Sequence, residues 1–102
     1  MPLFVIIGHD VADSTEKRLA ARPAHLERIT ALHGQNRLVA AGPTPIEFGQ
    51  PAMSGSIIIA HFDDIEAAKL WASEDPYIKA GVYGHVDVKP FIQVLPKPDE
   101  HA

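Results

Sequence analysis

The sequence predicts one α+β domain whose elements follow the order β-α-β-β-α-β. Its 102 residues supply the core of a single domain, and runs rich in β-branched residues alternate with segments of helical periodicity. Hydrophobic residues make up 46% of the chain and charged residues 22%, a mixture that argues against disorder. We expect the domain to span residues 1–95 and to be followed by a flexible tail over residues 96–102.

The first third of the chain predicts a strand and a helix. The apolar run Leu-Phe-Val-Ile-Ile predicts a strand over residues 3–7, and a helix should follow from Asp13 to Gly34. The apolar positions of this helix are Leu19, Leu26, Ile29 and Leu32. Pro23 lies inside the helix, so we expect a kink or a restart there.

The middle of the chain predicts a hairpin with a long connection. A short strand is expected over residues 37–41 and another over residues 56–62. Between them, residues 42–55 hold three prolines and three glycines, which predicts a loop. Loops of this length in a compact domain are often functional, so it is a candidate rim or lid.

The last third predicts a helix and a strand. Asp63 and Asp64 are candidate caps of the helix, which should end at Asp75-Pro76. Its apolar positions include Ile65, Ala68, Trp71 and Ala72. A turn to Gly81 should precede a strand over residues 82–88, and residues 91–95 are a candidate fifth strand.

This element order is that of the ferredoxin-like fold, with strand order 4-1-3-2 and both helices on one face of the sheet. The strands over residues 3–7 and 56–62 are apolar at nearly every position, so both of their faces require burial. Two helices cover one face only. We therefore expect a homodimer packed sheet against sheet, a dimeric α+β barrel; the alternative is that the apolar runs reflect β-propensity alone.

Charge and composition exclude several classes of function. Nine Lys and Arg against thirteen Asp and Glu give a net charge of −4, which disfavours nucleic-acid and membrane partners. RNA-recognition modules share this element order but stack bases on mid-strand aromatics, which residues 56–62 lack. The absence of cysteine excludes disulfides, thiolate metal sites and cysteine nucleophiles. No targeting or spanning segment is visible, so a cytoplasmic location is expected.

Six histidines raise the question of a metal site. His9 and His61 end neighbouring antiparallel strands, so they should lie at opposite ends of the sheet. His9 and His85 should approach each other, but two ligands without a carboxylate make a poor site. We therefore expect neither a metal nor another cofactor.

His25 is the histidine with a candidate catalytic role. It falls inside the apolar arc of the first helix, where lost hydration favours the neutral ring and its use as a base near pH 7. The alternative is a core histidine with both nitrogens satisfied. Arg18 and Arg22 lie on the same side of the helix. They are expected either to hold an anionic substrate or to extend over apolar surface.

Asp75 is the candidate partner of His25. It ends the second helix, where the helix dipole disfavours a carboxylate, and Pro76 forces it into an extended conformation. Asp75 is also a candidate cap of the following turn, and the two roles are compatible. A His–Asp pair without a nearby nucleophile indicates general acid–base chemistry. Ser56 is a weaker candidate for a substrate hydrogen bond, and its alternative role is that of a strand-start residue.

The sequence resembles the YciI-like (YCII-related) protein family over about residues 3 to 95. The motifs that carry the resemblance are Arg22-Pro23-Ala24-His25-Leu26, Asn36-Arg37-Leu38 with Ala41-Gly42-Pro43, Gly55-Ser56, Trp71-Ala72, Asp75-Pro76-Tyr77, Ala80-Gly81-Val82-Tyr83 and Val88-Lys89-Pro90-Phe91. The resemblance implies a dimeric ferredoxin-like α+β barrel with a site centred on His25 and Asp75. Pro23 departs from the family's pattern and would shift the direction of Arg22.

The resemblance also implies a class of reaction. An enzymatic relative removes chloride from a chlorinated hydroxymuconate, and related barrels include muconolactone isomerases. By analogy, we expect a lyase, isomerase or dehalogenase acting on a small acidic unsaturated compound. His25 would be the base and Asp75 its orienting partner. The residues expected to bind the substrate are Arg18, Arg22, Ser56 and Tyr77. The alternative function is a small-molecule-binding or regulatory module without turnover.

Overall fold

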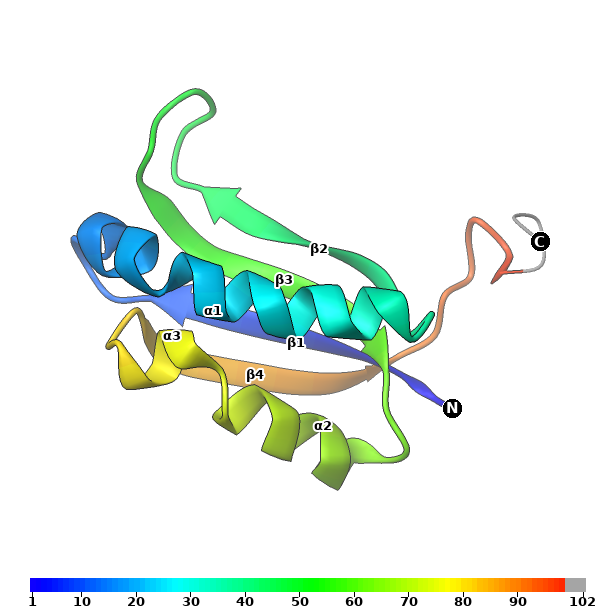
Figure 1. The fold of residues 1–102 in the computed structure, drawn as a ribbon. Helices are drawn as coiled ribbons and strands as arrows, with labels where there is room; N and C mark the ends of the chain where they lie inside the picture. Colours follow the sequence, from blue (N-terminus) through cyan, green and yellow to red (C-terminus); the bar gives the residue numbers. More distant parts are fainter. Residues whose placement is uncertain (99–102) are drawn as a thin grey trace.

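A computed structural model of the chain describes residues 1–98. Its elements are β1 (Leu3–Asp10), α1 (Thr15–Gly34), β2 (Leu38–Pro45), β3 (Met53–His61), α2 (Ile65–Ser73), α3 (Pro76–Lys79) and β4 (Tyr83–Phe91). The four strands form one antiparallel sheet in the order β2-β3-β1-β4 (Figure 1). The predicted ferredoxin-like order and the central position of β1 and β3 are therefore confirmed.

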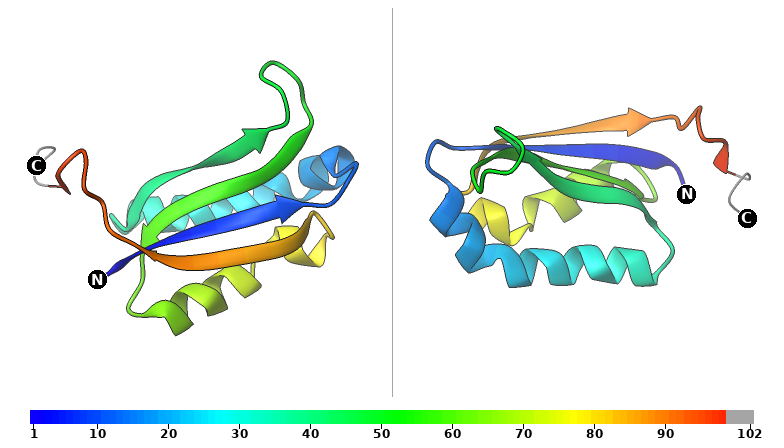
Figure 2. Two further views of the ribbon diagram at one scale, coloured as in Figure 1. Left: turned by 180° about the vertical axis from the view of Figure 1, so that it is seen from behind. Right: turned by 90° about the horizontal axis from the view of Figure 1, so that it is seen from above.

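The helices lie on one face of the sheet, as the edge-on view in Figure 2 shows. Alternate residues of β1, among them Phe4 and Ile6, point toward the helices and are buried. They pack with Ile29 of α1 and Ala68 of α2 in the main core. Burial of this one face, at about 25 cal/mol per Å² of apolar surface, holds the helical layer on the sheet.

The other face of the sheet carries no helix (Figure 2) and has apolar residues at its centre. Val5 and Ile7 of β1 are half-buried there, beside Ile57 and Ile59 of β3. Ile57 keeps 38% of its surface exposed. The two-sided apolar character predicted for these strands is thus present in the fold, and the homodimer expected to cover this face stays a prediction.

Helix α1 is one continuous helix through Pro23, but its buried stripe differs from the prediction. The buried residues are Arg18, His25, Ile29 and Leu32, whereas Leu19 is 66% exposed. The prediction for Leu19 is wrong because positions 18, 25 and 32 recur every two turns and define the inner face. The helix also begins at Thr15 rather than at Asp13, whose φ of 57° is not helical.

Strand β2 corrects the predicted loop over residues 42–55. The strand continues through Gly42 and Pro43 to Pro45, so the connection to β3 is limited to residues 46–52. A Gly-Pro pair normally indicates a turn. Here β2 is an edge strand, where a residue without a backbone N–H is tolerated because one side of the strand pairs with nothing.

The candidate fifth strand over residues 91–95 is wrong. Strand β4 runs to Phe91, which already pairs with Leu3 at the start of β1. Beyond this point no strand is left to pair with, and Ile92 and Val94 are 84% and 71% exposed. Of the predicted tail, residues 99–102 lie outside the described residues. Within residues 1–98, no helix has the length and hydropathy needed to cross a bilayer.

The sheet requires glycine at position 55, and this yields a stability prediction. A Cβ on Gly55 would overlap the backbone carbonyl of Gly8 on β1, so one strand would have to shift. We expect Gly55→Ala to lower the free energy of unfolding by about 1–3 kcal/mol, measured by chemical denaturation. Gly42→Ala is the matched control, because a Cβ at that position of β2 meets nothing within 4 Å. Equal stabilities of the two variants would contradict the strand spacing described here.

Candidate active site

A cavity of about 250 Å³ lies between α1, the sheet and α3. Its polar lining residues are Arg18, Arg22, His25, Ser56 and Tyr77. The rest of the wall is apolar and includes Leu26, Ile29, Leu38, Pro43 and Ile58. The volume is at the lower end of the range for ligand pockets, which suits a molecule of about one ring.

His25 forms a buried wall of this cavity and contacts a carboxylate. Its Nδ1 lies 2.9 Å and 3.0 Å from the two carboxylate oxygens of Asp75, and the residue is only 6% exposed. An ionised carboxylate only accepts hydrogen bonds, so Nδ1 carries the proton that it donates. The lone pair of a neutral ring is then on Nε2, for which residues 1–98 provide no hydrogen-bond partner. His25 is also one of the residues that line the cavity.

Asp75 is held in place by its own local structure. It is the N-cap of α3, with φ −63° and ψ 130°, and Pro76 follows it as the first helical residue. Its Oδ1 accepts a 2.9 Å hydrogen bond from the backbone N–H of Tyr77. The same carboxylate thus caps α3 and accepts from His25, so both roles that the sequence left open are seen in its contacts.

Tyr77 fixes the plane of the imidazole. Its ring stacks on His25 with centroids 3.8 Å apart and an interplanar angle of 9°, and it meets the edge of Tyr83 at 5.4 Å. Burial raises the pKa of the Tyr77 phenol, although the positive charges of Arg18 and Arg22 partly oppose this. The hydroxyl therefore stays protonated near neutral pH, so it offers a hydrogen bond rather than a base.

Arg18 is bound to other protein groups instead of being open to a ligand. It is 8% exposed and forms a two-pronged ion pair with Asp10 at the end of β1. Its Nη2 also donates to the carbonyl of Gly55 and to Oγ of Ser56, each at 2.7 Å. Burial opposes its charge, but Asp10 more than compensates and raises the pKa of the guanidinium. Arg18 thus supports the cavity wall, with its charge already neutralised.

Arg22 is the second cation in the lining of the cavity. It lies one turn further along α1, is exposed, and lines the same cavity. Among residues 1–98, its side chain takes part in no hydrogen bond or ion pair, in contrast to Arg18. Ser56, the other predicted contact residue, lies on β3 with its Oγ accepting from Arg18.

Three further residues support this site and were missed by the sequence analysis. Asp10 pairs with Arg18, and Ser14 donates a 2.6 Å hydrogen bond to the same carboxylate. Tyr83 is buried against Tyr77, and no group in residues 1–98 contacts its hydroxyl as a hydrogen-bond partner. The position of Asp10 could have indicated this pair. Asp10 ends the central strand β1 eight residues before Arg18, close to the start of α1.

The histidines outside this site match the prediction in part. His61 pairs with Leu3 and His9 with Gly55, so His9 and His61 lie at opposite ends of the sheet, as expected. His9 and His85 do meet, with ring centroids 5.4 Å apart. The expectation that they lack a carboxylate is wrong, because Asp87 contacts both rings. Asp87 follows His85 by two residues, so it lies on the same face of β4. The sequence analysis did not consider it as a ligand.

Solved structures with a similar fold include an enzyme. The 5-chloro-2-hydroxyhydroquinone dehydrochlorinase TftG of Burkholderia phenoliruptrix AC1100, in complex with 2,5-dihydroxybenzoquinone, matches with a TM-score of 0.79 and 26% identity, over 88% of this chain and 93% of that chain. Protein Atu4242 of Agrobacterium tumefaciens matches at a TM-score of 0.57 and 12% identity, over 96% and 98% of the two chains. The second likeness shows the fold alone.

Relatives at higher identity cover nearly the whole chain. Protein YciI of Escherichia coli O6:H1 is 52% identical over 97 residues, 91% of this chain and 99% of the relative. An uncharacterized protein of Haemophilus influenzae is 47% identical over 96 residues, 90% and 98% of the two chains. The family model for the YCII-related domain matches residues 2–92. The chain therefore belongs to the YCII-related domain family.

Proposed function

We propose that this protein is a small-molecule enzyme in which His25 is the general base and Asp75 orients it. The observation that carries the proposal is the arrangement of one imidazole. Its Nδ1 is bound to a buried carboxylate, and its other edge borders a cavity with Arg22 at the rim. A carboxylate at Nδ1 fixes the tautomer and stabilises the imidazolium that forms when Nε2 takes a proton.

The proposed substrate is a small, planar, acidic unsaturated compound. A cavity of about 250 Å³ with an apolar wall of Ile29 and Ile58 fits one ring or a short conjugated chain. The exposed guanidinium of Arg22 would pair with its carboxylate or ionised hydroxyl. The complex of TftG with 2,5-dihydroxybenzoquinone concerns a related fold at 26% identity, and it supports the choice of a one-ring acidic ligand here.

The proposed step is a proton transfer with a matching movement of electrons. Nε2 of His25 takes a proton from an acidic C–H or O–H group of the substrate. The electron pair released then forms a double bond and expels a leaving group such as chloride, which is an elimination. Alternatively, the imidazolium returns its proton to another carbon of the conjugated system, which is an isomerisation. Neither outcome needs an oxidant or a second substrate.

The competing function is a binding or regulatory module that uses the same cavity without turnover. The two functions differ in what His25 does to a bound molecule. If the protein only binds, neither the wild type nor His25→Gln should turn over the ligand, and ligand-induced thermal stabilisation should remain in both. Wild-type turnover that depends on His25 distinguishes the enzyme.

The first prediction concerns the His25–Asp75 pair. Muconates, muconolactones and chlorinated hydroquinones should be screened for turnover by absorbance. For a compound that is turned over, we expect His25→Gln and Asp75→Asn each to lower kcat by about 10²-fold or more, since they remove the base or its orientation. Asparagine retains an oxygen that can accept from the backbone N–H of Tyr77, so Asp75→Asn should keep the cap of α3.

His33→Gln is the matched control for this experiment. His33 is an exposed histidine in the last turn of the same helix and is not among the residues that line the cavity, so its loss should leave kcat unchanged. Wild-type kcat in His25→Gln would remove this residue from the mechanism. A loss in Asp75→Asn that is explained by unfolding, measured by circular dichroism, would remove the orienting role of Asp75.

The second prediction separates the two arginines. Arg22→Gln should raise KM about tenfold or more with little change in kcat or in stability, since it removes only a contact to the bound substrate. Arg18→Gln should instead lower the free energy of unfolding by about 3–5 kcal/mol, because Asp10 would stay buried without its partner. An unchanged KM in Arg22→Gln would show that the substrate is not held by this cation.

We also propose that the protein is a homodimer formed through the open face of the sheet. Val5, Ile7, Ile57 and Ile59 form the centre of that face. Isolated aliphatic residues on a surface are common, but a contiguous apolar face on a sheet is typical of an interface. A second copy offers the same surface, and twofold pairing would cover both at once.

Light scattering tests the dimer. Wild-type protein should have twice the monomer mass of 11.1 kDa, and Ile57→Glu should return it to the monomer mass because it places a charge at the centre of the interface. Leu70→Glu is the control, since Leu70 is 62% exposed on α2 and faces away from the sheet's open side. A wild-type monomer would refute the proposed interface.

A further inference from the structure

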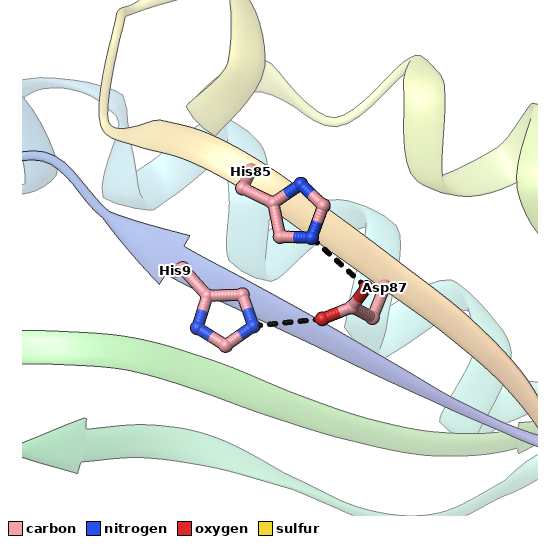
Figure 3. Close-up of side chains that lie close together, drawn as sticks. All are labelled: His9, His85 and Asp87. Atoms are coloured by element: carbon pink, nitrogen blue, oxygen red, sulfur yellow. Dashed lines mark hydrogen bonds and ion pairs between the residues drawn. The ribbon is translucent and has the colours of Figure 1, made fainter.

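A second cluster of polar side chains lies on the open face of the sheet, on the side opposite to the cavity (Figure 3). It consists of His9 on β1 and of His85 and Asp87 on β4. Nε2 of His9 lies 3.0 Å from one oxygen of Asp87, and Nε2 of His85 lies 2.9 Å from the other. These hydrogen bonds lower the pKa of the Asp87 carboxyl, so the group is an ionised carboxylate.

The backbone of two paired strands fixes this arrangement. His9 and His85 are direct cross-strand partners, and Asp87 lies opposite Ile7, the residue two positions before His9 on the same face. The pairing register shifts immediately after His9, and bulges of this kind commonly redirect side chains at functional sites. Because the three residues are carried by rigid strands, only side-chain rotations are needed to change the distances among them.

The three side chains make a donor set suited to a transition-metal ion. Two imidazoles and one carboxylate are ligands of zinc and of neighbouring first-row metals, whereas magnesium and calcium prefer oxygen. One ligand atom from each residue lies within 4.8 Å of the others. Around a tetrahedral zinc ion with bonds of about 2.0–2.1 Å, ligand atoms are about 3.4 Å apart. Closure by at most about 1.4 Å therefore completes the geometry, and rotation of the side chains permits it.

We propose that His9, His85 and Asp87 bind a divalent zinc-type ion through two imidazole nitrogens and a carboxylate oxygen. In this site the metal lies between the three side chains. It replaces the two protons that His9 and His85 share with Asp87 in the hydrogen-bonded cluster. Three protein ligands leave a coordination position open to water or to a further ligand. In a single chain the side chains keep 38–66% of their surfaces exposed, and in the proposed homodimer they would lie beside the aliphatic centre of the interface.

This site is distinct from the His25 site. His25 and Asp75 lie on the helical side of the sheet, whereas His9 points to the open side. Asp10, the residue next to His9, points its carboxylate to the helical side and binds Arg18. The proposed active site and the proposed metal site therefore share no residue and lie on opposite faces of the sheet.

Calorimetric titration of the full-length protein with zinc chloride, after removal of bound metal with a chelator, tests the proposal. We expect one ion per chain at this site and no comparable binding of magnesium. His85→Gln and Asp87→Asn should each weaken zinc binding about tenfold or more. Both residues are on the surface, so the variants should fold as the wild type does, which circular dichroism verifies.

Control variants locate the ion. His33→Gln and His101→Gln remove histidines elsewhere in the chain and should bind zinc as the wild type does. Histidine ring signals in NMR provide a second measurement, in which zinc should shift those of His9 and His85 and leave that of His25 in place. Unchanged zinc affinity in His85→Gln, or loss of zinc binding in His25→Gln with retention in His85→Gln, would overturn the proposal.

Discussion

The carboxylate of Asp75 lies between two groups that both depend on it, the Nδ1–H of His25 and the backbone N–H of Tyr77. A buried carboxylate is costly unless its lone pairs are satisfied, so these hydrogen bonds are a condition for placing it there. Its position in turn fixes the start of α3, which brings the ring of Tyr77 against the imidazole. The orientation of the candidate base and one wall of the cavity thus derive from one side chain.

The sequence predicted this pair because both residues break a local rule. A histidine among apolar positions of a helix and an aspartate at a helix end before proline are each unfavourable unless a partner compensates. The two residues are 50 positions apart, so neither motif alone predicts that they are in contact. The order of elements supplies the rest, because it places α1 and the segment after α2 on the same face of the sheet.

The parts that sequence reasoning missed depend on pairing between distant strands. The sequence leaves open whether Arg18 binds a substrate or extends over apolar surface, because Asp10, which neutralises it, belongs to another element. The ion pair lies on the inner face of the helix, where Arg18 is buried, whereas Leu19 is exposed. Gly42-Pro43 predicts that β2 ends there. The local sequence does not show that β2 lies at an edge of the sheet, where proline is tolerated. In each case the outcome depends on where a residue lies relative to the other strands of the folded sheet.

The two faces of the sheet carry different chemistry for a simple geometric reason. Successive strand residues point to opposite faces, so His9 and Asp10 are neighbours in the chain but lie on different sides. The helical side holds the cavity and the buried side chains of Arg18, His25 and Asp75, and burial strengthens the electrostatic contacts of these groups. The open side combines an aliphatic centre with a polar corner at His9 and His85. A homodimer through this face would leave the cavity of each copy on the outside of the paired sheets.

The proposed chemistry requires that Nδ1 of His25 holds a proton while Nε2 presents a lone pair to the cavity. Nitrogen-15 NMR of the histidine rings measures this directly, because protonated and unprotonated ring nitrogens differ strongly in chemical shift. We expect neutral His25 to be protonated at Nδ1 in the wild type and to lose this preference in Asp75→Asn. A neutral ring protonated at Nε2, or one that exchanges freely between the two forms, would contradict it.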